Sequence, residues 1–117
     1  MNTPEEAHVG MPALRTIPAG ALYIAADVHF MQGMIAHHGQ AIHMSRLAAS
    51  RDANPRLLRF ANKIDQSQEV EIRLMQEWLV ENGQAAPDAE SWRTMSMPGM
   101  LTADQLARLD SAKDREF

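Results

Sequence analysis

The sequence lacks cysteine, a basic stripe and any long apolar run, and each absence excludes a class of protein. Without cysteine the chain has no disulfide framework, no thiolate metal site, no cysteine-ligated iron–sulfur cluster and no CxxCH haem attachment. The 11 Lys and Arg residues are scattered and the formal net charge is −4, so we expect no nucleic-acid partner. No apolar run approaches the roughly 18 residues of a membrane span, and the N-terminus lacks the basic region and apolar core of a signal peptide.

The length of the chain and its distribution of proline indicate one domain preceded by an arm. With 117 residues, 45% hydrophobic and 22% charged, the chain is large enough for a single core and too small for two. Residues 1–20 contain three prolines and two glycines, a density that disfavours regular structure. We therefore predict an extended N-terminal arm over residues 1–20 and a helical domain over residues 21–117.

Two long helices are predicted from the apolar period and from the residues at their ends. From about residue 22 to residue 49 the period is close to 3.6 residues and no proline occurs. Asn54 and Pro55 form a cap and first-turn pair for a second helix, which Asn82-Gly83 stops after about residue 81. We predict that the two helices form a long antiparallel pair.

A short third helix follows a long connection. Residues 83–101 are punctuated by proline and glycine and are predicted as a loop. Thr102 to Gln105 form a capping box at the start of another helix. The predicted fold class is all-α: a helical bundle built on a long antiparallel helix pair plus a short C-terminal helix.

The first predicted helix concentrates the metal-binding side chains. The run from Asp27 to Ser45, DVHFMQGMIAHHGQAIHMS, holds four of the five histidines and three of the nine methionines. Imidazole and thioether together suit a soft or borderline metal ion. At about 100° per residue, one broad face that we expect to point inward contains Asp27, Phe30, Met31, Met34, His37, His38, Ala41, Met44 and Ala48.

Two adjacent histidines are the strongest candidate ligands. His37 and His38 diverge by about 100° around the helix axis, so they do not readily chelate one ion together. Met34 lies about one turn before both, which lets each imidazole pair with a thioether. Such pairs favour Cu(I), with Ag(I) as its mimic, whereas an added carboxylate from Asp27 or Glu71 would accommodate Cu(II) or Zn(II).

The other histidines of the helix are expected to play no part in this site. His29 and His43 point roughly opposite to the predicted inward face. We expect both to be solvent-facing.

The second helix offers two polar side chains inside an apolar stripe. Its shared face contains Leu57, Phe60, Ala61, Ile64, Gln68, Glu71, Ile72, Met75, Trp78 and Leu79. A carboxylate there needs a partner, so Gln68 and Glu71 either bind a metal or hydrogen-bond the histidines. Met75, like the methionines of the first helix, is either a ligand or a gap-filling core residue.

The predicted loop carries three more methionines. Met95, Met97 and Met100 place three thioethers within a short stretch of flexible backbone. They suit a soft ion, or they form a hydrophobic patch that covers the end of the bundle.

Enzymatic chemistry has little support. No serine lies in a GxSxG elbow, and neither long helix contains the Glu-x-x-His pair that di-iron carboxylate sites require. We therefore expect no catalytic residues.

The motif FMxxMIxHHxxAIxM followed by QxxEIxxMxxWL, with MPGM before the third helix, resembles the family called domain of unknown function 305. The resemblance covers about residues 22–117. It implies a ferritin-like bundle, export to the periplasm or out of the cell, and the copper or silver binding of some members. The motif positions that it implies are Asp27, Met31, Met34, His37, His38, Met44, Gln68, Glu71 and Met75.

Many members of that family carry a second copy of the histidine helix. Asp114 and Phe117 repeat the spacing of Asp27 and Phe30 at the end of this chain. We expect the sequence to stop before such a second copy.

The residues predict a metal-binding protein that is not an enzyme. We expect it to sequester or transfer Cu(I) or Ag(I) through the histidine–methionine face, with copper as the cofactor. Two long helices expose too much apolar surface to stand alone, so we expect a homodimer or higher homo-oligomer. The alternative is a structural or interaction bundle whose methionines only fill its core.

Overall fold

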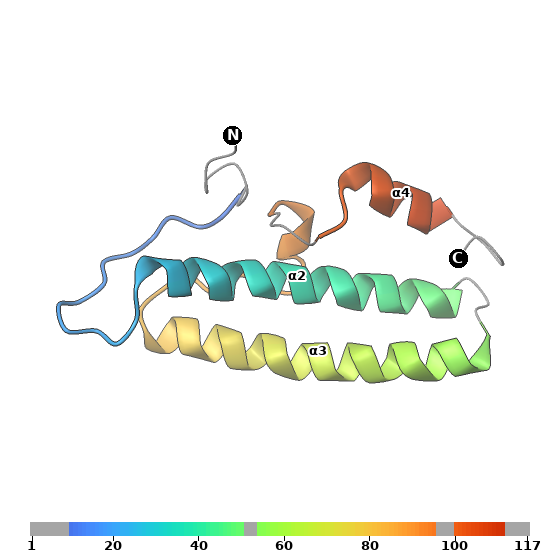
Figure 1. The fold of residues 1–117 in the computed structure, drawn as a ribbon, viewed down its shortest axis with the longest axis horizontal. Helices are drawn as coiled ribbons and strands as arrows, with labels where there is room; N and C mark the ends of the chain where they lie inside the picture. The colour runs from blue at the N-terminus through green and yellow to red at the C-terminus, as the bar shows by residue number, and fades with distance from the viewer. Residues whose placement is uncertain (1–9, 51–53, 96–99, 112–117) are drawn as a thin grey trace.

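The computed structural model describes residues 10–50, 54–95 and 100–111, and within them every regular element is a helix (Figure 1). The elements are α2 (Ala25–Ser50), α3 (Pro55–Glu81), the 3₁₀ helix η1 (Ser91–Arg93) and α4 (Ala103–Ser111). The long helices α2 and α3 run antiparallel side by side, and η1 and α4 lie along α2 (Figure 1). The predicted all-α class, its long helix pair and its short C-terminal helix are confirmed.

The helix ends follow from local capping. The Asn54 side chain accepts a hydrogen bond from the Leu57 backbone N–H at 2.9 Å, and Pro55 opens α3. Gly83 has φ +70° just past the C-terminal end of α3, where a left-handed residue ends the helix. At the start of α2, the Ile24 backbone N–H donates to the Asp27 carboxylate at 2.9 Å.

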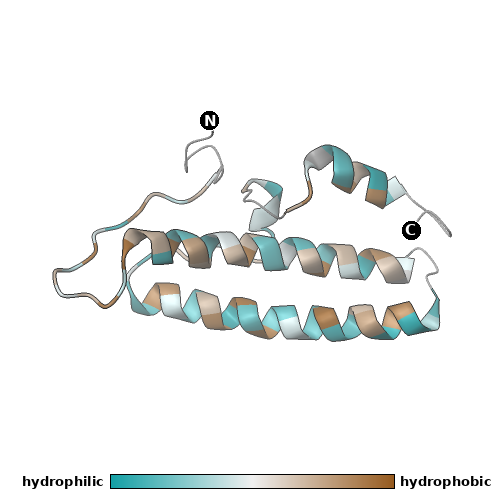
Figure 2. Cartoon of the chain, viewed as in Figure 1, coloured by the Kyte–Doolittle hydropathy of each residue, from teal (hydrophilic) through white to brown (hydrophobic). Residues whose placement is uncertain are grey.

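Hydropathy differs between the two long helices. Figure 2 shows alternating hydrophobic and hydrophilic bands along α3, whereas α2 carries no single dominant stripe. A helix that is apolar on several sides is usually contacted on several sides. This is the position of α2, because α3 packs on one side of it and the connection containing η1 packs on another.

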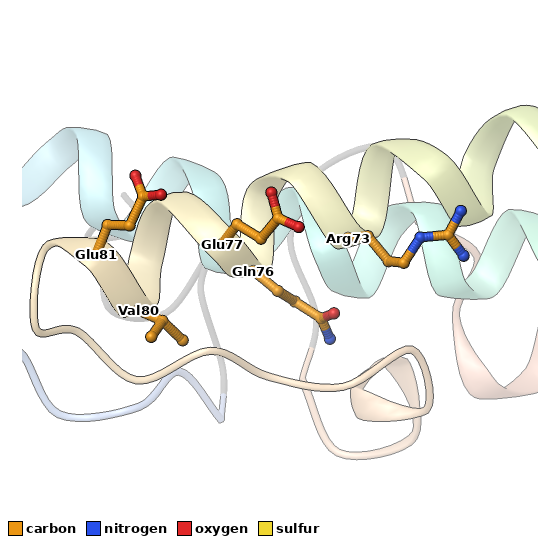
Figure 3. A pocket seen from close by; sticks show the side chains of 5 residues that line it. All are labelled: Arg73, Gln76, Glu77, Val80 and Glu81. Carbon is orange, nitrogen blue, oxygen red and sulfur yellow. The ribbon is translucent and has the colours of Figure 1, made fainter.

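The flank of α3 on the side away from Glu71 is charged. Arg73, Glu77 and Glu81 line a surface hollow of about 400 Å³ there together with Gln76 and Val80 (Figure 3). Val80 is 67% exposed. The connection reaches this flank at Gln76, which donates to the Pro87 carbonyl, whereas Val80 beside it stays exposed.

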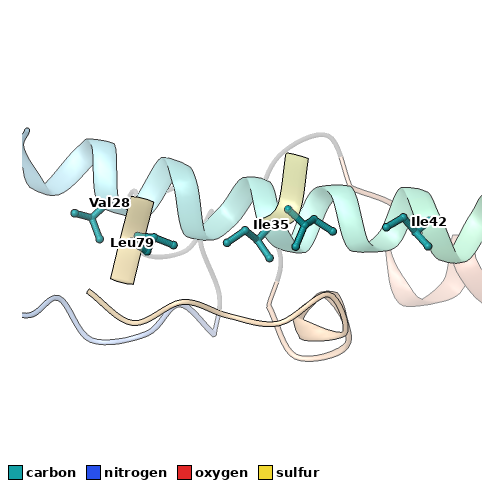
Figure 4. Packing of buried hydrophobic residues seen from close by; sticks show 5 residues of the cluster. Val28, Ile35, Ile42 and Leu79 are labelled. Atoms are coloured by element: carbon teal, nitrogen blue, oxygen red, sulfur yellow. The ribbon is translucent and has the colours of Figure 1, made fainter. Parts of the chain in front are cut away.

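The core is a narrow seam between α2 and α3. Val28, Ile35 and Ile42 of α2 are buried at seven-residue intervals and pack with Ile72 and Leu79 of α3 (Figure 4). A seven-residue spacing keeps one stripe in contact along two slightly crossed helices. Burying each such side chain stabilises the fold by about 1.5–3 kcal/mol.

The side of α2 that is buried differs from the side that was predicted to face inward. Phe30 is 57% exposed and Asp27 is also exposed, whereas the buried seam lies about a third of a turn around the helix. Ala48 alone of the nine residues assigned to that face is fully buried. Because α2 has apolar residues on all sides, several of its sides are candidates for burial. The side that packs against α3 is the one with the β-branched residues Val28, Ile35 and Ile42.

The face predicted for α3 is partly correct. Ala61, Ile72 and Leu79 are buried as expected. Phe60 is 62% exposed and Glu71 is exposed, so the stripe extends beyond what α2 covers.

Glutamine side chains attach the connection to the helix pair. Gln40 is buried and makes two hydrogen bonds with the Leu101 backbone: its amide donates to the carbonyl at 3.1 Å, and its oxygen accepts from the N–H at 2.8 Å. Gln32 and Gln76 donate to the carbonyls of Ala85 and Pro87, both at 2.9 Å. These bonds satisfy backbone groups that a loop packed on a helix would otherwise leave unpaired.

Gln84 attaches the N-terminal segment in the same way. It is buried, accepts from the Arg15 backbone N–H at 3.0 Å and donates to the Arg15 carbonyl at 3.0 Å. Residues 10–20 therefore lie against the connection without forming a helix or strand.

Within the ranges that the structure describes, no helix is long and apolar enough to cross a membrane. Residues 114 and 117, on which the expected second repeat depends, lie outside those ranges.

Candidate metal centre

Three sides of α2 face three different surroundings. Toward α3 lie Val28, Ile35 and Ile42. Toward the connection and α4 lie Gln32, Gly39, Gln40 and His43. The remaining side, which no described helix covers, carries Phe30, Met34, His37, Ala41 and Met44.

His38 lies at the border between this uncovered side and the seam. Its Nε2 is 2.5 Å from Glu71 Oε2, and the His38 side chain is 12% exposed against 50% for Glu71. Because a carboxylate oxygen accepts, Nε2 carries the hydrogen of this bond in the neutral ring. The lone pair of the neutral imidazole is then on Nδ1.

Two buried polar atoms near this pair have no hydrogen-bond partner. His38 Nδ1 is one of them, and Gln68 Oε1, three residues before Glu71, is the other. A buried acceptor without a partner costs about 1–3 kcal/mol. An unsatisfied imidazole nitrogen whose other nitrogen is fixed by a carboxylate has the arrangement of a metal-binding histidine.

The antiparallel register brings two thioethers to the same place. One turn back from His38 is Met34, and one turn forward from Glu71 is Met75, so the two methionines oppose each other beside the His38–Glu71 pair. Both are half-buried. The donors along this border are thus the His38 imidazole and two thioethers, with the Gln68 amide oxygen one turn from Glu71 in the opposite direction.

His37 contributes a separate donor on the uncovered side. Its ring centroid is 6.1 Å from that of His38, with 61° between the ring planes. The two rings diverge as predicted. Among the described residues no three His, Asp or Glu side chains come together to hold a metal.

The remaining predicted ligands are dispersed. Asp27 is exposed and bonds the Ile24 N–H, so it acts as a helix cap at the far end of the site. Met31 packs against the core, and Met44 is half-buried further along the uncovered side.

Among the described residues, the loop methionines do not lie beside His37 and His38. Met95 is 5% exposed and belongs to the core. Met100 precedes Leu101, which Gln40 holds on the opposite side of α2. Met97 lies outside the described residues.

His43 was expected to face solvent, and this prediction is wrong. Its ring lies 4.6 Å from that of Trp92 at 35°, and its Nε2 is 3.4 Å from Asp110 Oδ1. The sequence signal that could have indicated this is Gly39, one turn earlier, where a Cβ would be only 2.0 Å from the Ala89 carbonyl oxygen. The glycine lets the connection approach, and His43 then packs on it. His29 is half-buried.

A charge network joins the helices beyond the site. Arg46 Nε donates to Asp65 at 2.9 Å and Arg46 Nη2 to Glu69 at 2.6 Å. The hydrogen bond to Asp65 is the largest cause that raises the pKa of Arg46; burial opposes it, and the charges of Asp65, Glu69 and Glu90 add to the rise. The network links α2 to α3 about two turns along α2 from His38.

An antiparallel helix pair with an imidazole, thioethers and a carboxylate along one border defines a helical protein with a candidate soft-metal centre. The chain matches the family described as Domain of unknown function (DUF305) over residues 27–117, and it belongs to that family. The matched region contains His38, Glu71 and both opposing methionines. No curated protein matches the chain, and no solved structure matches it.

Proposed function

We propose that this protein binds a soft monovalent ion, Cu(I) or Ag(I), at His38 with Met34 and Met75 as neighbouring thioether donors. The observation that supports this most directly is the His38 ring, whose Nε2 bonds Glu71 while Nδ1 is buried without a partner. Glu71 would orient the ring, and the metal would bind the free nitrogen.

The donor set favours a soft ion over a harder one. Among the described residues no three His, Asp or Glu side chains converge, whereas the Met34 thioether lies one turn before His38 on the same helix. Thioethers select Cu(I), and carboxylate-rich sites suit harder divalent ions. Gln68, His37 and Met44 are secondary donors that a bound ion could recruit.

The proposed activity is sequestration or transfer of the ion, with no bond chemistry. Thioether and imidazole ligands hold Cu(I) without a thiolate, which suits an oxidising compartment such as the periplasm or the cell exterior. The absence of cysteine means that such binding would survive in that compartment without competing disulfide formation.

The test is an anaerobic Cu(I) titration against a chromophoric competitor. We expect stoichiometric binding by the wild type, loss of binding in the His37→Ala/His38→Ala variant, and weaker binding in Met34→Ala. Glu71→Gln should lower the affinity about tenfold or more, because the ring loses its carboxylate partner.

Two controls separate the site from general effects of substitution. His43→Ala removes an imidazole on the other side of α2, and Glu77→Gln removes a carboxylate on the far flank of α3; neither should change the affinity. Equal losses in all variants, or no binding by the wild type, would contradict the proposal.

A second reading is an interaction bundle without a metal. Met31 and Met75 pack against the hydrophobic core, which favours a packing role for these two side chains. A stoichiometric metal that resists dialysis and depends on His38 separates the two readings.

A further inference from the structure

One broad surface of the helix pair is apolar and uncovered. On α2 it carries Phe30, Met34, His37, Ala41 and Met44, and on α3 it continues through the residues that share a side with Glu71, namely Phe60, Ile64, Leu74 and Met75. We call these residues the outer face. Three of its large side chains are mostly exposed: Phe30 at 57%, Phe60 at 62% and Leu74 at 59%.

The outer face is bounded at one end by the N-terminal segment, where the Tyr23 ring packs edge-on against Trp78, a residue at the same helix azimuth as Phe60. The connection, η1 and α4 attach to α2 through the side that carries Gly39, Gln40 and His43. The far flank of α3 is instead charged, with Arg73, Glu77 and Glu81 (Figure 3). The exposed phenylalanines of the two long helices, Phe30 and Phe60, both lie on the outer face.

The total exposed area of the chain is larger than that of a compact monomer of the same mass. The chain exposes 7858 Å², whereas a compact monomer of 13.1 kDa exposes roughly 6,400 Å². Its radius of gyration is 16.2 Å, against roughly 13 Å for a compact domain of this length. The difference in area exceeds the roughly 800 Å² that each partner buries in a standard interface.

We infer that a second copy of this chain docks on the outer face. Two helix pairs stacked face to face give a four-helix bundle, and an isologous contact places Phe30, Phe60 and Leu74 of both copies in one new core. Glu71 lies at the border of this contact and is already paired with His38, and Arg56 shares the helix azimuth of Leu74.

The dimer also completes the candidate metal centre. Met34 and His37 lie on the outer face, so the second copy covers the His38 site and adds its own outer-face donors. This part of the inference rests on the proposed function. It predicts that Ag(I) tightens the dimer, because an ion that binds the associated state better shifts the equilibrium toward it.

The experiment is sedimentation velocity of the full chain over a wide range of concentration, without metal and with Ag(I). We expect a concentration-dependent dimer without metal, weakened about tenfold or more by Phe60→Glu and by Leu74→Glu. Val80→Glu is the matched control, because Val80 is equally exposed on the charged flank and should leave the dimer intact. Circular dichroism verifies that each variant keeps its helices.

The outcomes distinguish this inference from the proposed function. A wild type that stays monomeric at all concentrations, with and without Ag(I), overturns the inference even when Ag(I) binds. A dimer broken equally by the Val80 variant also overturns it. A dimer sensitive to Phe60 and Leu74 supports the inference even when no Ag(I) binds, and in that case only the metal proposal fails.

Discussion

His38 and Gly39 are neighbours in sequence but serve different contacts. His38 faces the border with α3, where Glu71 fixes its ring. Gly39 faces the connection, where there is no room for a side chain beside Ala89. Two successive residues on one helix therefore contribute separately to the candidate site and to the attachment of the connection.

Replacing Gly39 with alanine tests this close approach. Helix propensity alone predicts that Gly39→Ala stabilises the protein by about 1 kcal/mol. The contact with the backbone of Ala89, and with Trp92 at 3.0 Å, predicts instead a loss of about 1–3 kcal/mol. Urea denaturation gives the sign directly, and a gain in stability would show that the connection moves aside freely.

The seam between α2 and α3 is where single truncations should cost most. Leu79 is fully buried, so Leu79→Ala should lower the free energy of unfolding by about 2–5 kcal/mol. Val80, the next residue, is exposed, and Val80→Ala should change it by less than about 0.5 kcal/mol. Similar losses in the free energy of unfolding for both variants, measured by chemical denaturation, would contradict the assignment of Leu79 to the buried side of α3 and Val80 to the exposed side.

The helices were predictable because their ends carry local signals. Asn54, Pro55 and Gly83 act within one turn of their own position, so the bounds of α3 are readable from sequence. Helix α2 begins at Ala25, three residues later than predicted, because the Ile24 N–H is bonded by Asp27.

The buried side of α2 was not predictable from its pattern. Apolar residues occur all round this helix, since two different partners cover it, and periodicity does not rank them. The histidine–methionine face was predicted to point toward the core, whereas the residues that pack against α3 are Val28, Ile35 and Ile42. The pairing of His38 with Glu71 was among the stated alternatives, but the contact of His43 with Trp92 depends on the folded connection.

At the scale of the whole molecule, the protein is a thin layer, with extents of 54 × 33 × 17 Å. The last dimension is less than that of two stacked helix layers, each about 10 Å across. Its narrow core and large apolar outer face follow from this shape. Association is therefore the expected route to a thicker core.

Gln84 joins the N-terminal segment to the rest of the molecule, and its removal should release that segment. Gln84→Ala deletes both hydrogen bonds to the Arg15 backbone. We expect faster tryptic cleavage after Arg15, with α2 and α3 intact by circular dichroism. Gln66→Ala, at an exposed position of α3, is the control, and equal cleavage of both variants would contradict the role of Gln84.

The glutamine contacts also impose an order on folding. Only four residues of sequence separate α2 from α3, whereas the bonds from Gln32, Gln40 and Gln84 span 53, 61 and 69 residues. Contacts between distant residues form late because closing a long loop costs more chain entropy. Gln84 belongs to the connection, so we expect the N-terminal segment to dock after the connection has folded and to be the first part to exchange its amide hydrogens with solvent.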